Sequence, residues 1–206
     1  MSDSPDVLSV ILMFVGFALL FLVVFGSVLF FITRAGKATS RAWSELATRT
    51  GLTLKPASMF SFPELNGTFR GRPMRLYTYS SGTQRNRQTY TAVGLTLKNP
   101  VNATLEITPA SAVGSFFGKL VKAQDVEIGN AEIDGRFVIK SDPADFAMKV
   151  LGSISAQLGI MAIPDAFRIV LEGQSLRYSK RGVERDPELL MKVFNTLSDL
   201  AEDIER

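Results

Sequence analysis

Residues 7–33 read VLSVILMFVGFALLFLVVFGSVLFFIT and contain no charged side chain. As a helix rising about 1.5 Å per residue, this stretch would reach about 40 Å, compared with about 30 Å for the hydrocarbon core of a bilayer. A helix that is apolar on all sides for this length is uncommon in the core of a water-soluble domain. The stretch therefore predicts a transmembrane helix over residues 7–33, after a short tail of residues 1–6.

The charges on either side of this stretch predict its orientation. Asp3 and Asp6 precede it, whereas the basic residues Arg34, Lys37, Arg41 and Arg49 follow it. Basic residues favour the cytoplasmic side, so we expect the N-terminus outside and the remaining chain in the cytoplasm. The start of the chain lacks the positive region and cleavage site of a signal peptide. The expected location is the inner (plasma) membrane or an equivalent internal membrane, as a single-pass protein with the lipid bilayer as its first partner.

Two residue types are missing from the 206-residue chain, cysteine and histidine. Without cysteine there is no disulfide, thiol nucleophile or thiolate metal site. Without histidine there is no imidazole base at neutral pH and no His ligand for zinc. We therefore expect a protein that is not an enzyme, with no cofactor, no metal and no catalytic residues. An enzyme of another class would have to use carboxylates, Lys, Tyr or Ser.

Charge is distributed unevenly along the chain. Residues 34–98 carry a net charge of +9, and residues 99–206 carry −4. A basic surface beside anionic lipid gains about 1 kcal/mol per Lys or Arg. The side chains predicted to contact anionic lipid or an acidic partner are Arg34, Lys37, Arg41, Arg70, Arg72, Arg75, Arg85 and Arg87. The alternative is that these charges are simply solvated. Nucleic acid is not expected as a partner, because the sequence shows no aromatic-plus-basic platform.

The remaining chain predicts a joint and short helix over residues 34–51, followed by an α+β domain over residues 52–206. Trp43 is expected in the core of that domain. Period-two alternation between residues 52 and 108 predicts an antiparallel meander. Helices are expected over 111–124, 143–158 and 187–205, a strand over 136–141, and a hairpin turning near Gly173 and Gln174. The fold class is thus one transmembrane helix and a mainly antiparallel sheet packed by a C-terminal amphipathic helix. A pleckstrin-homology-like barrel is a special case, with two of the helices as insertions.

Two dipeptides predict helix starts. Asp142-Pro143 and Asp186-Pro187 each place a capping carboxylate before a proline at the first helical position. Other motifs do not fit a known chemistry. Gly114 to Lys119 has too few residues between its glycines for a phosphate loop. The acidic stretch Asp125, Glu127, Glu132 and Asp134 lacks the ligand spacing of a calcium-binding EF-hand, and facing water explains it more simply.

Small residues within 7–33 also form a line. Ser9, Gly16 and Ser27 fall on one side of the helix at 100° per residue, and small residues allow a second helix to approach closely. These three residues are therefore predicted to contact a transmembrane helix of a partner protein. An alternative is that the helix serves only as a tether.

The order of several motifs is similar to that of a known kind of protein. These motifs are Trp43-x-x-Leu46-Ala47, Pro63-Glu64-Leu65-x-Gly67, Ile133-Asp134-Gly135-Arg136-Phe137 and Leu197-x-x-Leu200-Ala201-Glu202. Together they resemble uncharacterised bacterial membrane-anchored domains. The resemblance implies no activity and no site residues. The predicted function is a non-catalytic, membrane-anchored accessory or scaffold subunit of a larger membrane protein assembly. The alternative is a tethered module that binds anionic lipid or another anionic ligand.

Overall fold

The computed structural model describes residues 7–58, 61–83, 85–112, 124–164 and 166–206; at residues 7–10 and 28–35 and at Gln124 only the backbone is described. The chain forms two compact units, residues 1–38 and residues 39–206. Helix α1 (Val7–Thr50) begins in the first unit and ends in the second. It is continuous through residues 34–37, where the sequence predicted a joint.

The predicted transmembrane helix over residues 7–33 is wrong. Within the ranges given above, no helix is both long enough and apolar enough to cross a membrane. The single-pass topology with an outside N-terminus, which depended on this helix, is therefore not confirmed.

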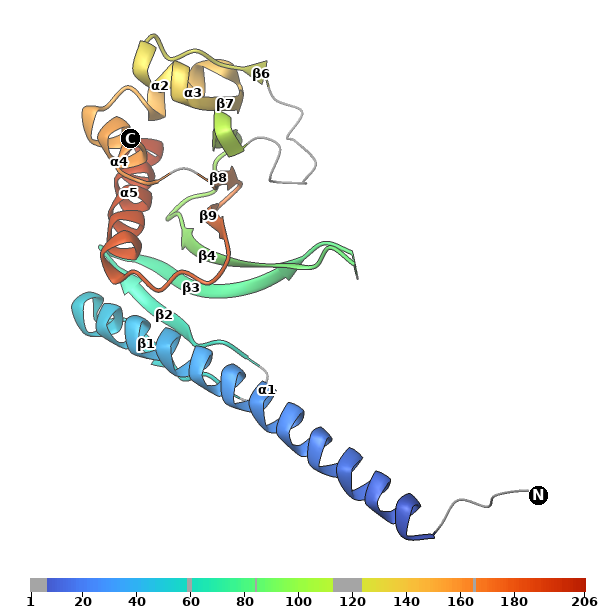
Figure 1. Cartoon of the computed structure of the whole chain (residues 1–206). Coiled ribbons are helices and arrows are strands. Elements are labelled where there is room, and N and C mark those ends of the chain that lie inside the picture. Colours follow the sequence, from blue (N-terminus) through green and yellow to red (C-terminus); the bar gives the residue numbers. More distant parts are fainter. Residues whose placement is uncertain (1–6, 59–60, 84, 113–123, 165) are drawn as a thin grey trace. The chain divides into compact units, whose positions relative to one another are not determined.

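The second unit is built on one antiparallel sheet, in which the described residues form nine strands in the order β1-β2-β3-β4-β9-β8-β5-β7-β6 (Figure 1). The strands are β1 (Thr53–Lys55), β2 (Glu64–Phe69), β3 (Arg72–Ser81), β4 (Gln88–Thr96), β5 (Thr104–Pro109), β6 (Gln124–Asp125), β7 (Phe137–Asp142), β8 (Phe167–Glu172) and β9 (Ser175–Arg181). Strands β1 and β6 stand at its two ends, so the sheet is open and the special case of a barrel does not apply.

The predicted meander is correct from β1 to β4 and wrong after β4. Strand β4 pairs with β9 over seven positions, with Val93 opposite Tyr178, and β5 lies between β8 and β7. The β8–β9 hairpin, whose turn at Gly173 and Gln174 is confirmed, therefore inserts between β4 and β5. Alternation along a strand predicts which residues share a face but not which strand is the neighbour.

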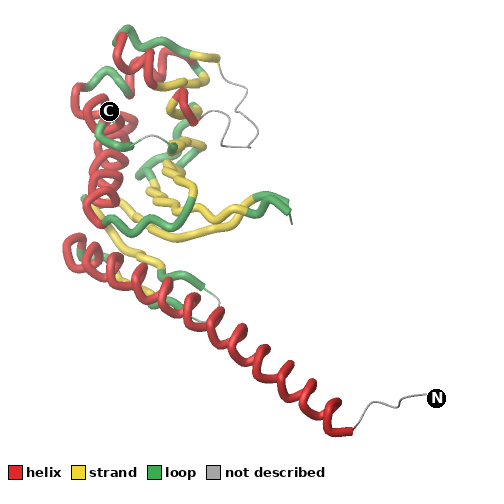
Figure 2. The backbone as a smooth tube through the Cα atoms, viewed as in Figure 1, coloured by secondary structure: helices red, strands yellow, loops and turns green. Residues whose placement is uncertain are grey.

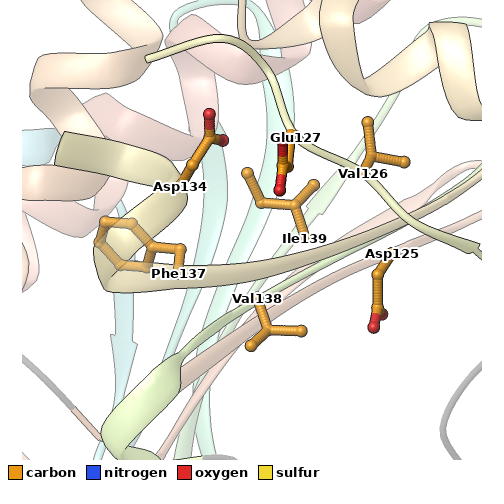
Figure 3. A pocket seen from close by; sticks show the side chains of 7 residues that line it. All are labelled: Asp125, Val126, Glu127, Asp134, Phe137, Val138 and Ile139. Atoms are coloured by element: carbon orange, nitrogen blue, oxygen red, sulfur yellow. The ribbon is translucent and has the colours of Figure 1, made fainter. Parts of the chain in front are cut away.

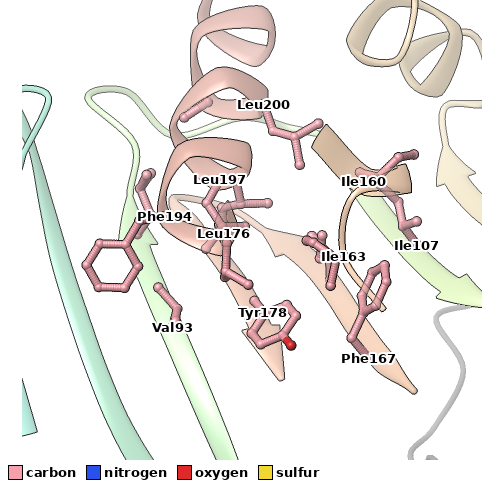
Figure 4. Close-up of a cluster of buried hydrophobic side chains, with 14 of the residues drawn as sticks. Val93, Ile107, Ile160, Ile163, Phe167, Leu176, Tyr178, Phe194, Leu197 and Leu200 are labelled. Atoms are coloured by element: carbon pink, nitrogen blue, oxygen red, sulfur yellow. The ribbon is translucent and has the colours of Figure 1, made fainter. Parts of the chain in front are cut away.

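Helix α5 (Pro187–Glu205) covers one face of the sheet and has the bounds predicted from its apolar stripe. Its buried side chains pack against the strands, and Figure 4 shows Phe194 beside Val93 and Leu197 beside Leu176. Trp43 at the C-terminal end of α1 is fully buried in the same core, as predicted. Burial of this apolar face supplies the main stabilisation of the unit.

Helices α3 (Ala144–Val150) and α4 (Ile154–Met161) pack beside α5 (Figure 2). The sequence predicted a single helix over residues 143–158. The structure ends α3 at Val150 because Ser153 begins a new helix, accepting a hydrogen bond from the backbone N–H of Ala156. Two short elements were not predicted, α2 (Ala131–Arg136) and the 3₁₀ turn η1 (Ala110–Ala112). Of the helix predicted over residues 111–124, Ser111 and Ala112 belong to η1 and Gln124 belongs to β6. Residues 113–123, with the glycine motif from Gly114 to Lys119, lie outside the described residues.

The two predicted helix caps differ in the structure. Asp186 accepts hydrogen bonds from the N–H groups of Glu188 and Leu189, which confirms it as the N-cap of α5. Asp142 instead ends β7, and the N-cap of α3 is Pro143, which has no side-chain cap. The prediction that Asp142 caps a helix is therefore wrong, because β5 and β7 pair in a register that holds Asp142 opposite Thr104.

This difference gives a matched pair of variants. Asp186→Ala leaves two N–H groups of α5 without their acceptor and should lower the free energy of unfolding by about 1 kcal/mol. Asp142→Ala removes no cap and should leave stability near that of the wild type. Thermal unfolding followed by circular dichroism checks both. Equal losses in the two variants would contradict the assignment of Asp186 as the cap.

Candidate functional site

The sheet face opposite α5 carries a row of tyrosines. On β3, Tyr77 and Tyr79 alternate with Leu76 and Thr78, so both rings lie on this face. Tyr90 on β4 is directly opposite Tyr79, and the two rings stack with centroids 5.3 Å apart and an angle of 17°. The Tyr77 and Tyr79 centroids are 6.2 Å apart. All three tyrosines are half-buried, so their rings are partly open to solvent.

Arginines flank these rings on the same face. The Arg75 guanidinium lies over the Tyr77 ring, 4.8 Å from its centroid, and also pairs with Glu64 at 2.9 Å. Arg181 is opposite Tyr90, and its Nε donates to the Gln88 side chain at 3.0 Å. Arg177 is opposite Gly94 on the same face. We call this surface the tyrosine–arginine face: Arg75, Tyr77, Tyr79, Tyr90, Arg177 and Arg181.

The β3–β4 hairpin extends the face beyond the end of β9, as Figure 1 shows. Ser81 pairs with Gln88 two positions past the last β4–β9 pairing, which joins Tyr90 and Arg181. Arg85 and Arg87 lie in the loop and are exposed. Gly82 begins this loop with φ of +110°, and a Cβ there would stand 2.3 Å from the Asn86 carbonyl oxygen. The loop therefore requires glycine at this position.

The surroundings of the face contain little negative charge. Residues 65–105 include six basic residues and no Asp or Glu. Among the described residues, no carboxylate lies within 4.0 Å of the side chain of any of four arginines. These four are Arg85, Arg87, Arg177 and Arg181. Guanidinium groups without a carboxylate bind phosphate and carboxylate groups well, and aromatic faces accept planar or sugar rings.

Three of the arginines predicted to contact lipid are held by acidic residues of the domain. Arg70 pairs with Asp199 of α5 at 2.6 Å, and Arg75 pairs with Glu64 as described above. Arg72 is a correction: only 5% of its side chain is exposed, and it binds Glu205 of α5 at 2.6 Å. Arg72 lies on the α5 face of the sheet, so it cannot reach a lipid surface.

The predicted lipid contacts near the start of the chain are not part of this group of paired arginines. Lys37 is exposed in the first unit, and Arg41 is exposed in the second. For Arg34 only the backbone is described. Arg70 and Arg75 are exposed beside aromatic rings, but each is paired with a carboxylate. Arg85 and Arg87 are exposed on the β3–β4 hairpin and have no carboxylate partner among the described residues.

The predicted line of small residues has no described helix partner. Gly16 is open, with no heavy atom within 4 Å of the place where a Cβ would stand. Ser27 donates its hydroxyl to the Val24 carbonyl within the same helix at 2.8 Å, and the side chain of Ser9 is not described. Because no described helix qualifies as a membrane span, these residues cannot be assigned to a transmembrane helix contact.

A pocket of about 480 Å³ lies between β7 and the segment that leads from β6 to α2 (Figure 3). Apolar side chains line much of it, and the carboxylates of Asp125, Glu127 and Asp134 complete its lining. Asp134 accepts hydrogen bonds from the N–H groups of Ile128 and Gly129, and Asp125 pairs with Lys140 at 3.5 Å. Asp134 is half-buried and holds the local turn, whereas Asp125, Glu127 and Glu132 are exposed to water, as predicted. The described residues include no group of three metal-ligating side chains.

Buried polar groups outside this pocket are paired with other residues or enclosed by the core. Glu106 and Arg168 form a two-bond ion pair at 2.7 and 2.9 Å, with Glu106 buried. Burial raises the pKa of Tyr178, whose hydroxyl has no hydrogen-bond partner among the described groups. Burial alone would also raise the pKa of Glu184, but hydrogen bonds from Lys180 and from two backbone N–H groups hold that pKa below its usual value. None of these groups lines a described pocket.

The tyrosine–arginine face is what sequence reasoning missed. The alternation of Tyr77 and Tyr79 was visible, but the stack with Tyr90 depends on the hairpin register, and Arg177 and Arg181 come from a strand almost 90 residues further on. The statement that the chain lacks an aromatic-plus-basic platform was therefore wrong about the surface itself. The identity of the partner is a separate question.

Comparisons with known proteins bear on the fold. No family model matches the chain, and no curated protein matches it. A solved structure, the crystal structure of the mycobacterial trehalose monomycolate transport factor A, TtfA, is similar with a TM-score of 0.57 and 12% sequence identity. The match covers 81% of this chain and 94% of that chain. At this identity the likeness shows a shared fold.

Proposed function

We propose that this protein is a non-catalytic accessory module that associates with a membrane and presents its α+β domain to a partner assembly. The observation that carries the proposal is the apolar surface of α1. Thirteen large apolar side chains between Ile11 and Phe25 are each more than half exposed. Contiguous apolar surface of this extent marks a site that binds lipid or another protein.

The comparison supports an accessory role. The protein with the similar fold is described as a trehalose monomycolate transport factor. The chemistry of this chain agrees with such a role, since it has neither histidine nor cysteine. The side chains that it exposes on its sheet, tyrosine and arginine, are typical of binding surfaces.

A second candidate function is the binding of an anionic ligand. The tyrosine–arginine face favours it, because four of its neighbouring guanidinium groups have no carboxylate partner among the described residues. This function is compatible with the first, since an accessory module can present a bound anionic ligand to its partner.

Flotation with vesicles tests the membrane association. The full chain is mixed with neutral phosphatidylcholine vesicles, and we expect it to float with them in a density gradient. Leu19→Asp with Phe21→Asp should reduce the floating fraction at least about tenfold, because each new carboxylate has to leave water to reach the lipid.

The control introduces two aspartates at exposed apolar positions outside α1. Met148→Asp with Leu158→Asp replaces two side chains that are also more than half exposed, on α3 and α4. This variant should float like the wild type. If the wild type stays at the bottom of the gradient, or if both variants lose flotation equally, the apolar surface of α1 is not the membrane contact.

A further inference from the structure

We infer that the β3–β4 hairpin is an anionic-lipid contact: Arg85 and Arg87 at its tip bind lipid phosphates, and Tyr79 and Tyr90 lie at the headgroup level. The inference rests on the proposed membrane association and adds a lipid class and a site. It concerns a different unit of the chain from the apolar surface of α1.

Position is the first argument. The hairpin reaches past the last pairing of β9, so its loop projects beyond the tyrosine–arginine face and is not paired with β9 (Figure 1). The described residues of the loop, which exclude Gln84, form part of a turn. The Asn86 N–H donates to the Thr83 carbonyl at 2.9 Å, and Gly82 takes the positive φ that closes the turn. Both loop arginines are therefore presented on a formed turn.

Charge is the second argument. Arg85 and Arg87 are exposed, have no carboxylate partner among the described residues, and stand in a stretch of 41 residues without Asp or Glu. Arg181, at the end of β9, adds a third guanidinium beside Tyr90. The natural complement of such a surface is negative. Anionic headgroups offer phosphate oxygens that match the guanidinium fork.

The aromatic rings are the third argument, and they favour lipid. Tyrosine has an apolar ring and a polar hydroxyl, which is why it is enriched where membranes meet water. Tyr79 and Tyr90 stack on the hairpin, two pairs away from the Ser81–Gln88 pair that precedes the loop. A stacked aromatic pair next to arginine also suits single-stranded nucleic acid. The experiment therefore includes that partner as an outcome.

The absence of cysteine in the chain permits a local measurement. Ser81→Cys in the full chain places one thiol at the exposed end of β3, where an environment-sensitive dye is attached. The Leu19→Asp and Phe21→Asp changes are included, so that lipid contact by α1 does not hide contact by the hairpin. Vesicles of phosphatidylcholine with and without phosphatidylglycerol are then titrated.

We expect the dye to respond to the phosphatidylglycerol vesicles and not to the neutral ones, and the response to disappear in 0.5 M salt, where screening is strong. Arg85→Gln with Arg87→Gln should raise the lipid concentration at half-response about 30-fold, the value for two basic residues near an anionic surface. Lys149→Gln with Lys192→Gln removes the same charge from exposed positions of α3 and α5 and should change it less than about threefold.

Three results would overturn the inference: an equal response to neutral and anionic vesicles, an equal effect of the two charge-removing variants, or a response to a thymidine oligonucleotide but not to lipid. The last would identify the face as a nucleic-acid site. These outcomes are distinct from a failure of the proposed function, which is measured by flotation of the wild type on neutral vesicles.

Discussion

Replacing Trp43 by alanine should lower the free energy of unfolding of the domain by about 4 kcal/mol, the largest effect that we expect from one substitution. Trp43 is fully buried in the core, and its Nε1 donates to the Glu184 carbonyl at 3.0 Å. The variant would lose both the packing of the indole and this hydrogen bond. For a chain of this size the expected fall in Tm is about 10 °C.

Two further variants separate the contributions. Trp43→Phe keeps an aromatic ring but cannot donate to Glu184, and we expect a loss of about 1–2 kcal/mol. Ser44→Ala, next along the helix and exposed, should have little effect. Because Trp43 is the only tryptophan, unfolding is followed by circular dichroism and not by fluorescence. A Tm for Trp43→Ala within 2 °C of the wild type, as an approximate limit, would show that the indole does not join the core.

Glu205→Gln should give the second large effect, a loss of about 3 kcal/mol. The Glu205 carboxylate accepts two bonds from Arg72, at 2.6 and 3.2 Å, and one from the Lys98 N–H at 2.6 Å. The Arg72 side chain is almost fully buried, so removing its partner leaves a buried charge with only Glu202 at 3.9 Å. A double-mutant cycle with Arg72→Met measures the coupling between the two residues. A coupling near zero would contradict this account.

The same pair predicts a dependence on pH. Burial alone would raise the pKa of Glu205, but hydrogen bonds from Arg72 and Lys98 hold that pKa below its usual value. A lowered pKa in the folded state stabilises the fold above the pKa of the unfolded chain, and this stabilisation is lost as the pH falls through the folded value. The wild type should therefore lose more stability between neutral pH and acid than Glu205→Gln does.

An exposed ion pair serves as the control. Glu45 pairs with Arg49 one turn along α1, and both side chains are at least two-fifths exposed. Glu45→Gln should leave Tm unchanged, because solvent already screens this pair. An effect as large as that of Glu205→Gln would mean that the loss reflects general charge changes and not the buried pair.

The sequence determined the local elements of this protein. Alternating Thr, Tyr, Val and Leu marked the strands, and the apolar stripe and Asp186 cap marked α5 from its first residue to its last. These elements were predictable because their signals lie within a few residues of one another. The burial of Trp43 was predictable for the same reason, since its helical neighbours Leu46 and Ala47 share its face.

Only the tertiary structure decided which strands are neighbours and which charges are free. The insertion of β8 and β9 between β4 and β5 brings Arg177 and Arg181 to the tyrosines, and the crossing of α5 places Glu205 and Asp199 on Arg72 and Arg70. Net charge along the sequence cannot distinguish a buried, paired arginine from an exposed one, because pairing depends on residues more than 100 positions away. The apolar run of residues 7–33 likewise predicted a membrane span, and none of the helices in the described part of the chain qualifies as one. Long-range packing therefore pairs Arg70, Arg72 and Arg75 with carboxylates and leaves Arg85 and Arg87, on the hairpin that carries the tyrosine stack, without a carboxylate partner among the described residues.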